Sequence, residues 1–147
     1  MNIEQIKQTI PPAKYNEYLK YIDLEDVYLK QIKGNLGTKE LSAQVNLSFN
    51  EKALLLELKD DYAKVRMNYQ IKAKHGQKII FNLSAEYLIV FHLAHRIPAE
   101  FFELYNKYSL PLQTFPYFRE LVNSMISRMG LPSLVLPLRK FLIGENN

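Results

Sequence analysis

The sequence predicts an α+β fold in which strands fill the middle of the chain and helices occupy both ends. Apolar and polar residues alternate through much of 27–93, which is typical of half-buried strands. Residues 1–26 and 98–130 instead repeat their apolar positions every three or four residues, which is typical of helices. At 147 residues the chain has the length of one domain with a real core. We therefore expect a single domain, 1–147, with an N-terminal helical extension (1–26), a sheet (27–93), and helices with a C-terminal segment (98–137).

Composition limits the classes of protein to which the chain can belong. Apolar residues make up 48% of the sequence and aromatic residues 12%, so the chain is neither disordered nor fibrous. Cysteine is absent, which excludes disulfides and thiolate chemistry and fits a reducing compartment. The N-terminus lacks the basic start and apolar run of a secretory signal, and no apolar run has the length needed to cross a bilayer. We expect a cytoplasmic protein without membrane insertion.

The first elements are a broken helical segment and two strands. Pro11 and Pro12 interrupt the helical pattern of 1–26, and a short amphipathic helix follows them. The first strand is weak, alternates over 27–32 and is ended by Gly34 and Gly37, while the second covers 44–49. The leucine-rich residues 54–58 fit three interpretations: an extension of the second strand, a local pairing, or an ordered loop.

Two further strands show the clearest alternation. Residues 63–73 place apolar side chains on one face and polar ones on the other, which favours a half-buried antiparallel strand. Residues 74–77 form a predicted hairpin turn, and the fourth strand runs from Lys78 to about Leu93. The second face of this strand changes from polar residues to Leu88 and Val90. The strand is then apolar on both faces, and both must be buried against other parts of the structure. We expect the cover of the second face to be an oligomer interface or a binding surface.

Two helices complete the predicted fold. The first begins at Pro98 and extends to about Tyr108, and residues 109–113 link it to the second. The second helix has Thr114 as its predicted cap, Pro116 at its first position and Gly130 at a left-handed end. Its apolar stripe, which we expect to pack in the core, consists of Phe118, Leu121, Val122, Met125 and Met129.

No pattern in the sequence predicts an enzyme or a cofactor. The five glycines form no phosphate-binding loop. His92 and His95 have no carboxylate at metal-ligand spacing, and Ser127 has no histidine placed to activate it in a known motif. The adjacent Asp60 and Asp61 are typical of a solvated turn.

The charge distribution does not favour nucleic acid as a partner. The formal net charge is +4 and is not concentrated in a basic tail. Lys64, Arg66 and Lys72 share one face of a predicted strand, but the aromatic residue of that strand, Tyr69, lies on the opposite face. A single-strand-binding surface would mix exposed aromatic and basic groups, so we interpret this face as solvated.

The most informative stretch is 115–137, FPYFRELVNSMISRMGLPSLVLP. It resembles the C-terminal signature of the SecB family of protein-export chaperones, in which FPYxRE is followed by SRxGxPxLxL and a proline. The resemblance implies a four-stranded antiparallel sheet followed by two helices. We expect Arg119 and Glu120 to tie the second helix to a neighbouring chain or loop. The matching residues are Phe115, Pro116, Tyr117, Arg119, Glu120, Ser127, Arg128, Gly130, Pro132, Leu134, Leu136 and Pro137.

The same resemblance implies a function. Members of the SecB family assemble as dimers of dimers and bind unfolded or partly folded polypeptides, without nucleotide, through apolar grooves between the sheet and the helix-connecting segment. The candidate groove consists of Tyr28, Ile32, Phe101, Phe102, Tyr105, Tyr108, Leu110 and Leu112. Helical spacing sets Phe102 to the side of its neighbours, so we expect Phe102 to be exposed. The alternative interpretation is that half or more of these residues fill the core or a subunit interface.

Two features depart from the export chaperones. Those proteins are strongly acidic and use an acidic surface and a C-terminal tail to engage the motor SecA, whereas this chain is net basic and shows no such tail, which counts against delivery to SecA. The basic charge and the N-terminal helical stretch suit the SecB-like proteins that protect an unstable antitoxin. Two other classes stay open: a dedicated partner-binding subunit without general holdase activity, and a carrier of a small apolar ligand in the sheet–helix groove.

Overall fold

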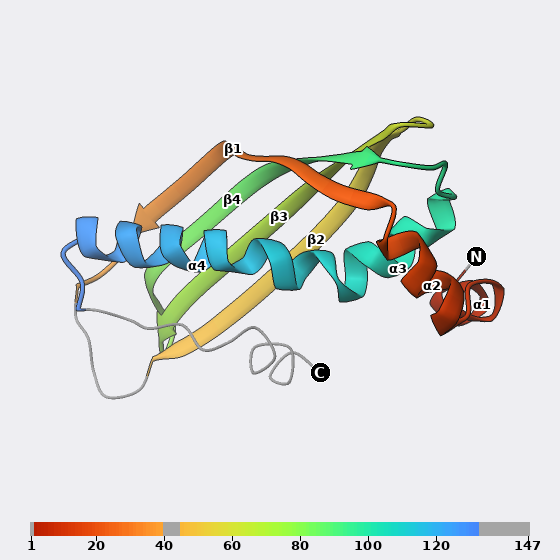
Figure 1. Cartoon of the computed structure of the whole chain (residues 1–147). Helices are drawn as coiled ribbons and strands as arrows, with labels where there is room; N and C mark the ends of the chain where they lie inside the picture. The colour runs from red at the N-terminus through yellow and green to blue at the C-terminus, as the bar shows by residue number, and fades with distance from the viewer. Residues whose placement is uncertain (1, 40–44, 133–147) are drawn as a thin grey trace. The chain divides into compact units, whose positions relative to one another are not determined.

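A computed structural model of the chain describes residues 2–39 and 45–132. Its elements are, in order, α1 (Ile3–Thr9), α2 (Pro12–Leu19), β1 (Ile22–Leu36), β2 (Asn46–Leu58), β3 (Tyr62–His75), β4 (Lys78–Leu93), α3 (Ala99–Tyr108) and α4 (Leu110–Arg128). The strands form one sheet in the order β1-β4-β3-β2, so that β1 and β2 are the edge strands (Figure 1). The predicted α+β class, the four-stranded antiparallel sheet and the N-terminal helices are confirmed.

The chain divides into two compact units. Unit 1 comprises Met1–Lys30, Ala53–Met67 and Tyr87–Gln113, and unit 2 comprises Gln31–Lys52, Asn68–Glu86 and Thr114–Asn147. Each strand contributes residues to both units, and so does α4. Each unit has an aromatic core of its own.

The central strands follow their sequence pattern closely. The odd-numbered residues of β3 from Ala63 to Ala73 are at most 1% exposed, whereas the even-numbered ones between them are half-buried. β4 has the predicted bounds, and the turn before it holds Gly76 at φ +59°. This left-handed conformation is readily adopted by glycine because it has no Cβ.

The edge strands are longer than the pattern predicted. β1 begins at Ile22, inside the stretch expected to be helical, and continues through Gly34 to Leu36. Gly37 follows it, and an added Cβ there would lie 2.1 Å from the carbonyl oxygen of Ile79, so the close pairing with β4 requires a glycine. β2 includes residues 54–58, so the correct interpretation of this stretch is an extension of the second strand. Both edge strands are exposed or half-buried over most of their length, and this weak alternation hid their true bounds.

Capping residues and prolines determine where the N-terminal helices and α3 begin. Asn2 caps α1 through a capping box, in which its side chain accepts from the backbone of Gln5 and the Gln5 side chain accepts from the backbone of Asn2. α2 starts at Pro12, the position that best tolerates a missing N–H. Pro98 stands just before α3 and is its N-cap residue. The predicted break at Pro11 and Pro12 and the predicted first C-terminal helix are therefore confirmed.

The second C-terminal helix begins earlier than predicted. α4 starts at Leu110, so residues 109–113 are no linker, and Thr114 and Pro116 lie inside the helix. Pro111 falls in the first turn, where its missing N–H removes no helical hydrogen bond. Thr114 is 1% exposed, and its hydroxyl lies 2.6 Å from that of Tyr69, so it is a core residue and not a cap.

The core of unit 2 joins α4 to the sheet. The rings of Tyr69 and Phe118 stack with centroids 4.9 Å apart, and Phe49 meets Phe115 edge-on at 5.5 Å. Aromatic pairs of this kind add about 0.5–1.5 kcal/mol beyond the burial of their surface. Phe118 and Val122 of the predicted stripe are 0% exposed and pack in the core, whereas Leu121, Met125 and Met129 are only half-buried.

The end of α4 is the left-handed one that the sequence predicted. Gly130 has φ +72°. The N–H of Leu131 donates to the carbonyl of Ile126 at 3.2 Å, and that of Gly130 donates to the carbonyl of Ser127 at 3.0 Å, which together form a Schellman motif. The rest of the predicted C-terminal segment, residues 133–137, lies outside the described residues.

Within residues 2–39 and 45–132, none of the helices combines the length and the apolar character required to span a lipid bilayer.

Candidate functional site

Unit 1 is built around aromatic side chains on α3. Phe101 and Tyr105 are one helical turn apart, and their rings stack with centroids 5.5 Å apart. Phe101 also packs against Tyr15 and Tyr18 of α2, at centroid distances of 5.0 and 5.5 Å. α2 therefore covers one side of α3.

The prediction that Phe102 is exposed is wrong. Phe102 is 0% exposed, and its ring faces Phe91 of β4 at a centroid distance of 6.4 Å. Helical spacing does set Phe102 to the side of Phe101, but that side of α3 lies against the sheet. Four of the predicted groove residues are thus core residues of the single chain: Phe101, Phe102, Tyr105 and Leu110 are all at most 1% exposed.

The other four predicted groove residues are on the surface. Tyr28, Tyr108 and Leu112 of unit 1 are 41%, 44% and 60% exposed, and Ile32 of unit 2 is 37% exposed. These are the members of the predicted groove that a bound polypeptide could reach without unfolding the chain.

The edge strand β1 exposes more apolar surface than the groove prediction included. Leu24, Tyr28, Ile32 and Leu36 recur every fourth residue, and each is exposed by more than a third. Residues at i, i+2 and i+4 share one face of a strand, so alternation places Leu24 and Tyr28 of unit 1 on one face, and Ile32 and Leu36 of unit 2 on one face. Sequence reasoning missed Leu24 because it began the strand at residue 27, and it missed Leu36 because it ended the strand at Gly34. A four-residue apolar repeat from residue 24 was the signal that could have identified them.

The other edge strand has an exposed apolar pair. Leu54 and Leu56 of β2 are 44% and 40% exposed, and they lie two residues apart on one face. They belong to the leucine-rich stretch that the sequence left ambiguous. Edge strands usually limit such exposure because it invites pairing with other chains.

The predicted oligomer interface on β4 is partly covered by the chain itself. Leu88 is 6% exposed, while Val90 is half-buried. Val90 is therefore the more accessible of the two, and its role in an oligomer stays a prediction.

Two tyrosine hydroxyls are held inside unit 1. The hydroxyl of Tyr105 donates to Oε1 of Gln113 at 2.8 Å, and burial raises the pKa of Tyr105 to about 12. The hydroxyl of Tyr15 lies 2.5 Å from Oγ of Ser109, and burial also raises its pKa. Both groups are neutral at physiological pH and supply no charge. Tyr105 joins α3 to the start of α4, and Tyr15 joins α2 to the C-cap of α3.

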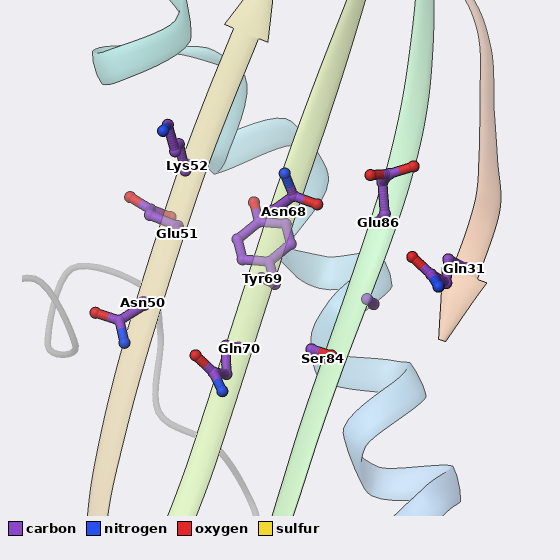
Figure 2. Close-up of a pocket in the computed structure, with 10 residues that line it drawn as sticks. Gln31, Asn50, Glu51, Lys52, Asn68, Tyr69, Gln70, Ser84 and Glu86 are labelled. Carbon is purple, nitrogen blue, oxygen red and sulfur yellow. The ribbon is translucent and has the colours of Figure 1, made fainter. Parts of the chain in front are cut away.

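A polar depression of about 340 Å³ lies on unit 2. Figure 2 shows the side chains of Asn50, Asn68 and Gln70 on neighbouring strands, with Glu86 on β4 and Gln31 on β1. Sequence reasoning did not identify this depression. Its lining contains no histidine, and the amides can exchange hydrogen bonds but cannot transfer protons at neutral pH.

The described part of the chain offers no group of three His, Asp or Glu side chains that could hold a metal ion. The ring of His95 packs against that of Tyr21 at 4.4 Å, which is a structural contact. Exposed apolar side chains on β1, on β2 and on α3 are the remaining candidates for a binding surface.

Comparison with known proteins places the chain in a family. The model of the family described as preprotein translocase subunit SecB matches residues 13–141. The chain belongs to the SecB family. The resemblance of residues 115–137 to the family signature is thereby confirmed, and α1, which ends at Thr9, precedes the matched region.

Two curated proteins support the assignment. The protein-export protein SecB of Alkalilimnicola ehrlichii is 32% identical over 133 residues, which cover 90% of this chain and 66% of that protein. The protein-export protein SecB of Bradyrhizobium sp. is 26% identical over 132 residues, which cover 88% of this chain and 78% of that protein. The chain thus spans slightly under two thirds of the length of the first relative.

A solved structure supports the fold. A SecB-like chaperone of Mycobacterium tuberculosis, in complex with a ChAD peptide from an antitoxin, superimposes with a TM-score of 0.73 at 16% identity. The match covers 84% of this chain and 95% of that one. This similarity confirms the SecB-like fold.

Proposed function

We propose that this SecB-family chain is an ATP-independent chaperone that holds unfolded or partly folded polypeptides. It acts in the cytoplasm as a homo-oligomer, either a dimer or a dimer of dimers. The family is described as preprotein translocase subunit SecB, and the two curated relatives are named protein-export protein SecB.

The observation that carries the proposal is the exposed apolar series on β1. Non-native polypeptides differ in sequence but share apolar side chains that are buried in native proteins. Leu24 and Tyr28 are exposed by 44% and 41%, and charged residues such as Asp26 and Lys30 lie between the apolar positions. An apolar surface interspersed with charges can bind apolar segments while the free chaperone resists aggregation.

The edge position adds a second contribution. An edge strand presents backbone N–H and C=O groups that an extended client segment can pair with. Backbone pairing is independent of sequence, so it suits a protein that binds many clients. Tyr108 and Leu112 supply further exposed apolar surface on unit 1.

The test compares two exposed tyrosines. Tyr28→Asp places a charge in the apolar series of β1, and Tyr117→Asp places the same charge on an equally exposed residue of α4 (41% and 47%). We expect Tyr28→Asp to weaken the binding of a permanently unfolded client at least tenfold and Tyr117→Asp to change it less than twofold, measured by fluorescence anisotropy. Equal affinities of a well-folded Tyr28→Asp variant and the parent chain would remove β1 from the client site.

A second candidate is the protection of an antitoxin. The fold is shared with a chaperone solved in complex with an antitoxin peptide, and the net charge of this chain is +4. Export chaperones engage the motor SecA through an acidic surface, whereas this chain is net basic. Delivery of clients to SecA is therefore the least favoured of the proposed roles. Protection of one antitoxin, without protection of unrelated clients, would favour this candidate.

A further inference from the structure

Unit 1 contains an apolar pocket that the groove prediction did not include. It lies where α1, α2 and α3 meet, has a volume of about 330 Å³, and is lined by Lys7, Ile10, Pro12, Tyr15, Asn16, Leu104 and Tyr108. Ile10 and Leu104 are 5% and 4% exposed, so they lie at its inner side. The volume falls at the small end of the range for ligand sites, which suits one small apolar group.

The pocket depends on the break between the first two helices. Ile10 ends α1, Pro11 is extended (φ −68°, ψ 164°), and α2 restarts at Pro12. α1 packs against α3, and Tyr15 of α2 packs against Phe101 of α3. Lys7 and Ile10 precede residue 13, where the match to the family begins, so this pocket is built partly by residues outside the matched region.

The polar groups around the pocket are few and mostly basic. The Nζ atoms of Lys7 and Lys107 lie 5.2 and 5.5 Å from the centroid of the Tyr108 ring. Lys7 also forms an ion pair with Glu4 at 3.4 Å, in which both side chains are well exposed. An exposed pair of this kind contributes little and can exchange partners. The hydroxyl of Tyr15 is already bonded to Ser109, and the ammonium of Lys7 is hydrogen-bonded to the hydroxyl of Tyr108. The ammonium of Lys7, the hydroxyl of Tyr108 and the amide of Asn16 are the polar groups that remain to meet a ligand.

We propose that this pocket binds a small apolar group that carries one carboxylate. The apolar part lies against Ile10, Leu104 and the Tyr108 ring, and the carboxylate pairs with Lys7. A cationic ligand would be repelled by the ammonium of Lys7 in the lining and by that of Lys107 beside the Tyr108 ring. A phosphate would call for several converging charged donors, such as an arginine fork, whereas the lining supplies one charged donor, the ammonium of Lys7.

Such a carboxylate could belong to the C-terminal residue of a peptide or to a free carboxylic acid, and a titration distinguishes them. The probes are N-acetyl-leucyl-phenylalanine, the same dipeptide with a C-terminal amide, and octanoate, each added to the full chain labelled at the methyl groups of isoleucine and leucine. We expect the Ile10 and Leu104 methyl signals to shift with the dipeptide acid, and binding of the amide to be at least tenfold weaker. Octanoate binding as tightly as the dipeptide acid would assign the site to free acids, and weaker octanoate binding would assign it to peptide C-termini.

Two matched variants test the role of Lys7. Lys7→Met keeps an apolar chain of similar length and removes the charge, and Lys107→Met removes the other lysine beside Tyr108, which does not line the pocket. We expect Lys7→Met to weaken binding of the dipeptide acid about tenfold and Lys107→Met to change it less than twofold. Equal losses from both variants, or no shift of either methyl signal at millimolar probe, would overturn the proposal. The readout uses no unfolded client, so its failure would leave the proposed chaperone function untouched.

Discussion

Thr114 has a different role from the one that its position before Pro116 predicted. A threonine before a proline is a common helix start, so the sequence favoured a cap. In the structure α4 is already in its second turn at this residue, and the buried hydroxyls of Thr114 and Tyr69 lie 2.6 Å apart. The hydrogen bond joins α4 to β3 within unit 2.

Thr114→Val should therefore destabilise the protein although it conserves shape. Loss of a buried hydrogen bond costs about 1–3 kcal/mol when a polar partner stays behind. Thr9→Val is the control, since Thr9 is exposed on α1 and bonds only to the Gln5 carbonyl of its own helix. Urea unfolding at one fixed protein concentration measures both, and equal effects of the two variants would contradict the assigned role.

Tyr105 gives the structure a dependence on alkaline pH. Its pKa is about 12 in the folded protein, above the ordinary value of 10, because burial disfavours the phenolate. The folded state thus keeps a proton that the unfolded state releases, so the contribution to stability is complete below pH 10 and is lost between pH 10 and about 12. Tyr15, whose pKa is also raised by burial, acts in the same direction.

Between pH 10 and about 12, the midpoint of thermal unfolding should fall in the parent chain. It should fall less in Tyr105→Phe. Ultraviolet absorbance of the phenolate should show one late tyrosine titration in the parent chain that is missing from the variant. If the unfolding midpoint of the variant depended on pH as strongly as that of the parent, other titratable groups would control the loss of stability.

At the scale of elements, the sequence predicted central strands better than edge strands. β3 and β4 have neighbours on both sides. β3 alternates strictly between buried and half-buried residues, β4 does so from Phe81 to Tyr87, and both patterns are visible in the sequence. β1 and β2 have exposed apolar residues on their surfaces, so the period-two signal weakens and their bounds were misjudged. The start of α4 was missed because Pro111 and Pro116 are both valid first-turn residues, and only packing decides which one begins the helix.

Pro116 inside α4 provides a prediction about that helix. A proline in a helix interior costs about 3 kcal/mol relative to alanine, and its restriction of the unfolded chain returns up to about 1 kcal/mol. Pro116→Ala should therefore stabilise the protein by about 2 kcal/mol. Pro111→Ala should not stabilise it, because the first turn tolerates a missing N–H and the Pro111 side chain is buried. A Pro116→Ala variant no more stable than the parent in thermal unfolding would argue against a continuous α4.

At the scale of the whole molecule, the fold class and the family were predictable, whereas the client surface was predictable only in part. The signature at 115–137 is local in sequence, so it could be read directly. Exposure depends on which elements cover one another, and periodicity could not show that α2 and β4 cover both sides of α3. Half of the predicted groove residues are consequently buried, and Leu24 and Leu36 were missed.

Self-association belongs to the same scale. If the second face of β4 is an oligomer interface, Val90→Glu should lower the mass measured by analytical ultracentrifugation, because a charge would be buried without a partner. Lys72→Glu, on a half-buried position of β3 in unit 2, is the control and should leave the mass unchanged. An unaltered oligomer in Val90→Glu would place the interface elsewhere.

The central claim is general binding of non-native chains, and aggregation suppression tests it most directly. Two unrelated denatured proteins are diluted into buffer with near-stoichiometric amounts of this chain and no nucleotide, and light scattering is followed. We predict that the scattering of both is suppressed. Suppression of neither, by a sample whose circular dichroism shows the folded α+β protein, would contradict the claim and indicate a dedicated partner.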